Sequence, residues 1–413
     1  MVQYQAERAG RWASTGLLLG CLDFRLLVIG QVISTCGDML YLVSLPFLVF
    51  SQGGSPITLA ATLTVYGLTR LAATLPAGAL VDRVGPRAVM LAASAGQGLA
   101  VAVLALAAAT GRPTTALLML VGAGLGAGEG AYRPAGKAIT PALVAPDQLP
   151  AANAISITSN LLATIFGPAL GGLGLVLASP ALMFWLDAAT FACSAVTLLL
   201  IQQGRAPAAS YPEREREGEP RTVLDFLRGS AFFRVAILMM AMVGLSIAGT
   251  LQVALPVLAR QTPALGPAGY GFLRAALGAG MVLGGVLGGV AGRRPRPGRL
   301  VIGMIAVEGL LLAALPDLPD AAAMLCGMAA VGILDGALTV VVITVLQRVP
   351  PPRLRGRVLG VLSFAGFAMF PISVAVAGTV VSRFPVAAMF LITGLGFGLV
   401  ALMGAASRTM RDA

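Results

Sequence analysis

Histidine is absent from the 413-residue sequence, and there are only four cysteines and two tryptophans. Without histidine, imidazole-based acid–base catalysis and imidazole metal ligation are excluded. The cysteines are scattered, with no metal-ligand or disulfide spacing, and three of them lie within apolar stretches, so we interpret them as small core residues. They are Cys21, Cys36, Cys193 and Cys326.

Charged residues are also scarce, at 11% of the chain against 57% hydrophobic residues, and the mean hydropathy is +0.89. A soluble globular chain is about 25% charged. Lipid must therefore solvate most of this chain, and only helices satisfy their own backbone hydrogen bonds over such long apolar runs. The formal charge is +11, but the arginines lie in short loops between apolar runs. We therefore expect a multi-pass protein of the inner or plasma membrane, with no nucleic-acid partner.

Charge-poor runs that approach the roughly 20 residues of a spanning helix recur along the whole chain. They cover residues 24–50, 57–81, 88–109, 114–137, 152–178, 181–201, 234–258, 267–291, 299–316, 321–346, 357–380 and 385–406. This pattern predicts twelve transmembrane helices. The longest polar interval divides them six and six, so we predict a bundle over 1–201, a cytoplasmic linker over 202–233 with a short amphipathic piece near its end, and a second bundle over 234–413.

The loops indicate both orientation and internal symmetry. Nearly all loop arginines and lysines fall on the side that holds both termini, whereas only Arg112, Arg260 and Arg383 fall on the other. Basic loops stay in the cytoplasm, so both termini are predicted to be cytoplasmic. The proline-marked turns 141–153 and 347–357 occupy equivalent places six helices apart. Two pseudo-symmetric six-helix bundles are a transporter architecture.

The loop between the second and third runs reads GALVDRVGPRAVM. It resembles the loop signature of the major facilitator superfamily, although Pro86 stands at a position that is usually basic. The matching residues are Gly78, Asp82, Arg83, Gly85 and Arg87. The resemblance implies a cytoplasmic gate: Gly85 permits a tight reversal, and Asp82 can bond the amides or arginines of a neighbouring helix. The alternative is an ordinary charged turn.

Residues spread over nearly the whole chain narrow the resemblance to the subgroup that contains the macrolide-efflux proteins and the enterobactin exporter. They are Phe24-Arg25, Gly30-Gln31, Gly37-Asp38, Pro46, Ala152-Asn153-Ala154, Phe184-Trp185-Leu186-Asp187 and Leu354-Arg355-Gly356-Arg357. The subgroup exports chemically diverse compounds. The resemblance therefore implies export and leaves the substrate open.

The fifth run contains helix breakers at its centre: Gly167, Pro168, Gly171 and Gly172. Proline removes a helix hydrogen bond, and glycines let a neighbouring backbone approach closely. The segment resembles the Gly-Pro-x-x-Gly-Gly antiporter signature of drug–proton exchangers, with Ala163 and Ala154 in place of its upstream glycines. That resemblance implies a seal between helices. The alternative is a generic packing face, like the one predicted from Gly280, Gly284, Gly288 and Gly292.

Four acids within the apolar runs are selected as mid-membrane candidates: Asp38, Glu129, Glu308 and Asp335. Burying a charge in a membrane costs at least about 2.5–3.5 kcal/mol, so such groups are functional candidates. By resemblance, Asp38, Glu129 and Asp335 face a central site and are candidate proton carriers, whereas we interpret Glu308 as structural. Each acid could instead be half of a fixed ion pair, with Arg70 neutralising Asp38 and Arg133 pairing with Glu129, which Gly128 and Gly130 would expose.

Soft apolar side chains suggest the substrate cavity, and the candidates are Tyr41, Met239, Met242 and Phe367. Methionine adapts to varied hydrophobic guests. The alternative is that these residues face lipid or fill the core.

Together these features favour a monomeric secondary transporter that exports small amphipathic or hydrophobic compounds, drug-like or siderophore-like, by proton antiport. The proton gradient would be its energy source, and we expect no cofactor or metal. A proton-coupled metabolite importer and a lipid or lysophospholipid flippase on the same fold remain alternatives. An integral-membrane enzyme is disfavoured, because no Asp-rich, histidine or nucleophile constellation occurs in the loops.

Overall fold

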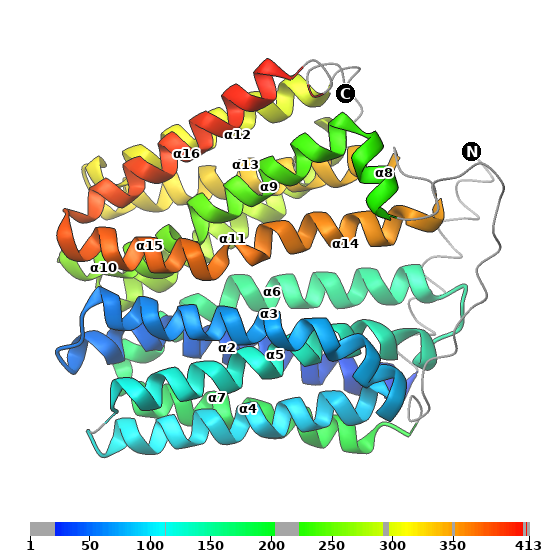
Figure 1. Ribbon diagram of the computed structural model, residues 1–413. Helices are drawn as coiled ribbons and strands as arrows, with labels where there is room; N and C mark the ends of the chain where they lie inside the picture. Colours follow the sequence, from blue (N-terminus) through cyan, green and yellow to red (C-terminus); the bar gives the residue numbers. More distant parts are fainter. Residues whose placement is uncertain are drawn as a thin grey trace, which may run out of the picture. The chain divides into compact units, whose positions relative to one another are not determined.

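The structure is a computed structural model that describes residues 21–111, 113–202, 223–291, 297–348, 352–407 and 410. These residues form helices joined by short turns, as the all-helical prediction required (Figure 1). Most of the predicted linker, residues 203–222, and the middle of the 347–357 turn, residues 349–351, lie outside the described residues. The predicted amphipathic piece corresponds to the short helix α8, Val223–Gly229.

Ten helical stretches of the described residues are long and apolar enough to cross a membrane. They are Leu22–Ser51 (α2), Pro86–Ala109 (α4), Leu149–Leu177 (α6), Pro180–Leu200 (α7), Ala231–Gln261 (α9, η1 and α10), Gly266–Gly289 in α11 (Gly266–Ala291), Gly298–Asp317 in α12 (Pro297–Ala314) and η2, Ala321–Thr344 in α13 (Ala321–Arg348), Gly360–Arg383 in α14 (Pro352–Ala368) and α15 (Phe370–Arg383), and Val386–Ala406 (α16). The remaining long helices, Pro56–Val84 (α3) and Thr115–Leu143 (α5), each have 29 residues and carry three charged side chains.

The chain divides into two compact units. Unit 1 comprises residues 1–48 and 65–210, and unit 2 comprises 49–64 and 211–413. Residues 49–64, the end of α2 and the start of α3, thus group with unit 2 by their contacts. The contacts explain this assignment: the Arg260 guanidinium lies 5.1 Å from the centre of the Phe50 ring, and the Thr64 hydroxyl donates to the Pro371 carbonyl at 3.4 Å. An arginine over an aromatic face is a favourable cation–π contact.

Small residues bring the helices of unit 1 together. The helix α4 packs against α5 and α7 (Figure 1). On α2, Gly37 lies so close to Thr190 and Asp187 of α7 that a Cβ there would overlap both side chains. Close backbone approach through glycine is how helices associate without a hydrophobic driving force between them. This contact places the middle of α2 directly beside a buried acid.

The predicted antiporter segment lies on a face of α6 that packs against α2. A Cβ on Gly167 would come within 2.6 Å of the Met39 Cβ, and one on Gly171 within 3.2 Å of the Val43 Cβ. Pro168 is buried, and α6 continues through it from Leu149 to Leu177. The glycines therefore serve close packing between two helices of the same unit.

In unit 2, α11 packs along α13, α12 packs against α13 and α16, and α9 packs against α14, α15 and α16 (Figure 1). The predicted glycine stripe forms the α11–α13 contact. Cβ atoms added at Gly280, Gly284 and Gly288 would overlap the backbone of α13. Gly292 lies outside the described residues.

We expect Gly284→Leu to destabilise the protein, whereas Gly289→Leu on the same helix is tolerated. A Cβ at Gly284 would overlap the Ile333 backbone, but one at Gly289 meets nothing within 4 Å. Overpacking a tight contact costs about 1–3 kcal/mol, and here a rigid helix backbone has to move. Thermal unfolding of the two detergent-purified variants measures the difference. Equal melting temperatures would show that this glycine contact is not tight.

Candidate functional site

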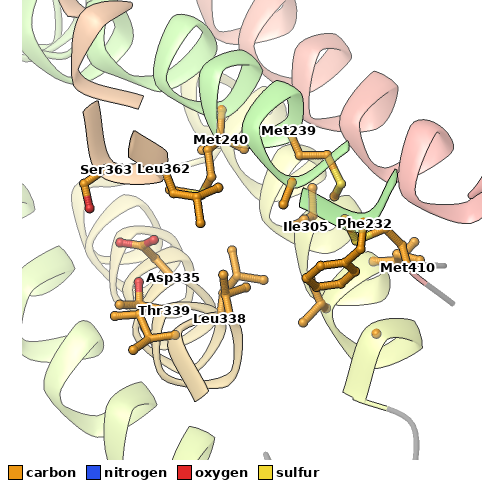
Figure 2. A pocket seen from close by; sticks show the side chains of 17 residues that line it. Phe232, Met239, Met240, Ile305, Asp335, Leu338, Thr339, Leu362, Ser363 and Met410 are labelled. Carbon is orange, nitrogen blue, oxygen red and sulfur yellow. The ribbon is translucent and has the colours of Figure 1, made fainter. Parts of the chain in front are cut away.

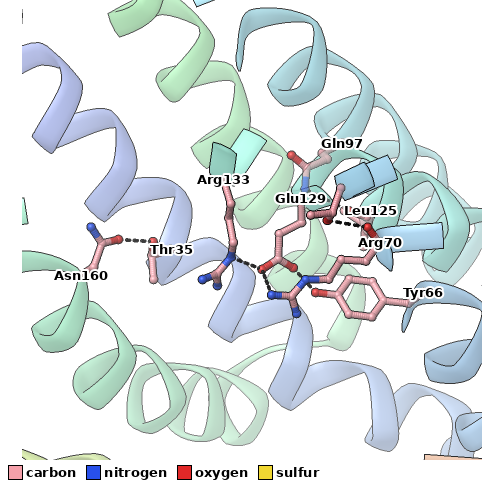
Figure 3. A network of polar contacts seen from close by, with 9 residues as sticks. Thr35, Tyr66, Arg70, Gln97, Leu125, Glu129, Arg133 and Asn160 are labelled. Atoms are coloured by element: carbon pink, nitrogen blue, oxygen red, sulfur yellow. Dashed lines mark hydrogen bonds and ion pairs between the residues drawn. The ribbon is translucent and has the colours of Figure 1, made fainter. Parts of the chain in front are cut away.

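A charge network inside unit 1 is formed by Tyr66 and Arg70 of α3 with Glu129 and Arg133 of α5 (Figure 3). The Arg133 Nε donates to Glu129 Oε1 at 2.6 Å, and an Arg70 guanidinium nitrogen lies 3.4 Å from the same oxygen. The Tyr66 hydroxyl donates to the other carboxylate oxygen. Residues four apart on a helix share one face, so each helix contributes two members to the network.

Burial divides the charge network into an inner and an outer part. The side chains of Arg70 and Glu129 are each 19% exposed, whereas Arg133 is 64% exposed. Gly130 lies against the Arg70 backbone, and Gly128 lies against the Gln97 side chain of α4. These glycines therefore allow α3 and α4 to approach α5 closely. The interpretation that they expose Glu129 is wrong.

Asp38 lies midway along α2 and is partly buried. It interacts electrostatically with Asp187, Glu129, Arg133 and Arg70. Among the described residues, the ion pairs within 4 Å are Arg70–Glu129 and Arg133–Glu129. The structure thus places Arg70 on Glu129 and leaves Asp38 with longer-range partners.

Asp187 of α7 is an acid that sequence reasoning did not select as a site. It is 0% exposed, and its Oδ2 has no hydrogen-bond partner in the described part of the chain. Thr190 donates to its Oδ1 at 3.3 Å. The signal was available, because Asp187 is the only charged residue of the run 181–201, and the membrane cost of a charge applies there as well.

Unit 2 contains a cavity of about 250 Å³ into which Asp335 of α13 projects (Figure 2). Apolar side chains form most of its wall, among them Met239 and Met240 of α9, and Thr339 and Ser363 are polar. Buried Glu308 interacts electrostatically with Asp335, and its Oε2 has no hydrogen-bond partner among the described residues.

Of the side chains predicted to line a substrate cavity, the structure places one in this wall. Met239 lines it, whereas Met242 and Phe367 do not. Phe367 is 53% exposed. Tyr41 belongs to unit 1, where its ring centre lies 5.8 Å from that of Phe184.

The predicted gate loop forms the reversal between α3 and α4. Gly85 has a φ of 85°, in the left-handed region that favours glycine, and α4 begins at the next residue. Arg87 donates to the carbonyls of Leu198 and Leu199 at 2.6 and 2.7 Å, and so caps the C-terminus of α7. Asp82 and Arg83 are exposed, and within the described residues Asp82 makes no ion pair. At Gly78 an added Cβ would meet nothing within 4 Å.

Sequence comparison identifies relatives along most of the chain. The multidrug efflux pump Tap of Mycolicibacterium fortuitum is 26% identical over 396 residues, covering 94% of this chain and 96% of the relative. Tap of Mycobacterium tuberculosis is 28% identical over 391 residues, covering 91% and 92%. An uncharacterised transporter, y4rN of Sinorhizobium fredii, is 29% identical over 278 residues, covering 64% and 65%.

Solved structures share the fold at low identity. The nucleoside transporter NupG, as a D323A mutant, superposes with a TM-score of 0.72 at 13% identity, covering 93% of this chain and 99% of that one. A bacterial homologue of the iron transporter ferroportin, in its inward-facing state, gives 0.69 at 16% identity, covering 93% and 98%. The family model described as Major Facilitator Superfamily matches residues 27–374. The chain therefore belongs to the major facilitator superfamily and is a multi-pass membrane transporter of small molecules.

Proposed function

We propose that this transporter exports small amphipathic or hydrophobic compounds in exchange for protons. In this proposal it has twelve transmembrane helices with both termini in the cytoplasm, and it works as a monomer by alternating access. The Tap relatives, named multidrug efflux pumps, cover more than 90% of the chain and support export. The glycine–proline face of α6 supports exchange, because a helix pair packed this closely leaves little room for an ion leak.

The observation that carries the proposal is the unequal charge of the network in unit 1. Two guanidinium groups face the single Glu129 carboxylate, so the network has one excess positive charge. Asp38 lies within electrostatic range of it. An ionised Asp38 brings the group to neutrality, and a protonated Asp38 restores the excess charge. The group is neutral when Asp38 is ionised and carries one excess positive charge when Asp38 is protonated. We infer that a carboxylate whose protonation changes the local charge balance in this way can bind and release a proton during transport.

The roles of the acids follow from their partners. Glu129 is held by two arginines and a tyrosine, so we assign it to keeping both cations in place. Among the described residues, no arginine or tyrosine bonds the Asp38 carboxylate. We therefore assign the exchanged proton to Asp38. Asp335 projects into the cavity of unit 2 and is the candidate proton carrier of that unit.

The cavity of unit 2 supports an apolar substrate class. Met239 and Met240 lie on its wall beside aliphatic side chains, and polar groups are few (Figure 2). Flexible thioethers adapt to guests of different shape. We propose that this wall contacts the apolar part of the exported compound.

Everted membrane vesicles from an efflux-deficient host test the direction and the energy source. In such vesicles respiration acidifies the lumen, and an exporter moves its substrate inward in exchange for protons. We expect vesicles that contain the protein to accumulate the lipophilic fluorescent dye ethidium, and nigericin, which collapses the pH gradient, to stop accumulation. Accumulation that is unchanged by nigericin would overturn proton antiport. Faster loss of preloaded dye on acidification would indicate import.

A further inference from the structure

Asp187 stands apart from the charge network, although it lies in the same unit. Its side chain is fully buried, and Oδ2 faces no donor among the described residues. The hydroxyl of Thr190 is its hydrogen-bond donor, at 3.3 Å, and that hydroxyl also bonds the Asp187 carbonyl at 2.7 Å. A carboxylate placed in this way would be a charge in a low-dielectric environment with one weak donor, which is strongly unfavourable.

Among the described residues, the groups that face Asp187 contain no cation. On α2, Gly37 is in contact with Asp187. Asp38 and Tyr41 of the same helix interact electrostatically with Asp187. The helix α4, which packs along α7, contributes the uncharged Gly98, which lies against Ala188 and Phe191. The arginines of the charge network are paired with Glu129. In this environment a neutral carboxylic acid is the stable form, because it has no charge to be removed from water.

The position of Asp187 along its helix places it beside Asp38. Under the proposed topology, α7 begins at the outer surface with Pro180 and ends at the cytoplasmic side, where Arg87 caps it. Asp187 is seven residues into the helix, about 10 Å from its outer end at 1.5 Å per residue. Gly37, the chain neighbour of Asp38 on α2, is in contact with Asp187, so the two acids lie at about the same level of the unit. Glu129 is the middle residue of α5, and Arg133 lies one turn further toward its cytoplasmic end.

We propose that Asp187 is a second proton-binding residue, which passes a proton to Asp38. The inference rests on the proposed antiport. In the transfer step the O–H bond at Asp187 Oδ2 breaks and an O–H bond forms on the Asp38 carboxylate. Asp187 then takes a proton from water that reaches it in the outward-open state. In the present conformation its burial keeps that proton from exchanging with solvent.

Infrared difference spectroscopy and transport of purified full-length protein test this assignment together. We expect the C=O band of a protonated carboxylic acid in wild type, which Asp187→Asn removes and Asp187→Glu moves to a different frequency. In proteoliposomes, Asp187→Asn should lose at least tenfold in gradient-driven ethidium accumulation and keep downhill ethidium equilibration within about twofold. Asp147→Asn is the matched control: it makes the same chemical change at an exposed acid outside the spans, and it should retain gradient-driven accumulation.

The possible outcomes separate the two proposals. Carboxylic-acid bands that are all unchanged in Asp187→Asn, or accumulation equal to wild type in that variant, would overturn the role of Asp187. If Asp187→Asn does not fold, the band in Asp187→Glu decides, since an unmoved band refutes the assignment. If wild type shows the band that Asp187→Asn removes but ethidium accumulation does not depend on the pH gradient, the proposed antiport is refuted. Asp187 is then protonated but has no role in coupling.

Discussion

Replacing Asp38 by asparagine is expected to abolish gradient-driven export while the protein remains folded and in the membrane. Asparagine has nearly the shape of the protonated acid but cannot release a proton, so the exchange cycle stops in its protonated state. Downhill equilibration of ethidium should persist, because it needs the conformational change alone. We expect a loss of at least tenfold in accumulation, measured in proteoliposomes with an imposed pH gradient.

The matched control for this prediction is Asp147→Asn. It makes the same chemical change at an exposed acid outside the spans, so transport and melting temperature should equal those of wild type. If Asp38→Asn accumulates ethidium as wild type does, Asp38 is not the proton carrier. Asp335→Asn in the same assay then shows whether the carrier lies in unit 2.

The second large effect is expected for Glu129→Gln, which removes the carboxylate that both arginines of the charge network share. Arg70, at 19% exposure, would be left with its charge largely out of water and without this ion partner. Breaking a buried ion pair by removing one partner costs on the order of 3 kcal/mol. We therefore expect a clear fall in melting temperature and in the yield of folded protein, together with loss of transport.

A double-mutant cycle identifies the origin of this effect. Adding Arg70→Met to Glu129→Gln removes the cation that has lost the Glu129 carboxylate and should recover much of the lost stability, so the two changes are not additive. Arg133→Ala should cost far less, because Arg133 is 64% exposed and surface ion pairs contribute about 0–1 kcal/mol. If Glu129→Gln melts like wild type but loses proton coupling, Glu129 is a proton carrier and its ion pairs are incidental.

Much of the helical framework was predictable, because a membrane-spanning helix requires a long apolar run and such runs are visible in the sequence. The apolar runs match the observed helices to within a few residues, and the polar run after 201 interrupts them. The glycine stripe of α11 was readable as a packing face from its four-residue period, and the structure confirms it at Gly280, Gly284 and Gly288. At Gly85 the residue type alone predicted a reversal, and the φ of 85° confirms it.

The sequence predicted which charged residues belong to the candidate site. It predicted much less well which of them form ion pairs with one another. Sequence spacing can place Arg133 one turn from Glu129, because both lie on one helix. It cannot choose between Asp38 and Glu129 as the partner of Arg70, because three separate helices carry these residues. For the same reason Arg87 was predicted as a gate residue, whereas the structure shows it capping α7, more than a hundred positions away along the chain.

The sequence by itself determined that this chain resides in a membrane, that it is built from helices, and that it carries acids whose burial in lipid is costly enough to indicate a function. It did so because hydration and backbone hydrogen bonding act on composition and on residues close along the chain. The tertiary structure decided that Glu129 holds two arginines and that Asp187 is buried beside Gly37. Those outcomes depend on how each helix is rotated against its neighbours, and that rotation is set by close packing across many residues at once.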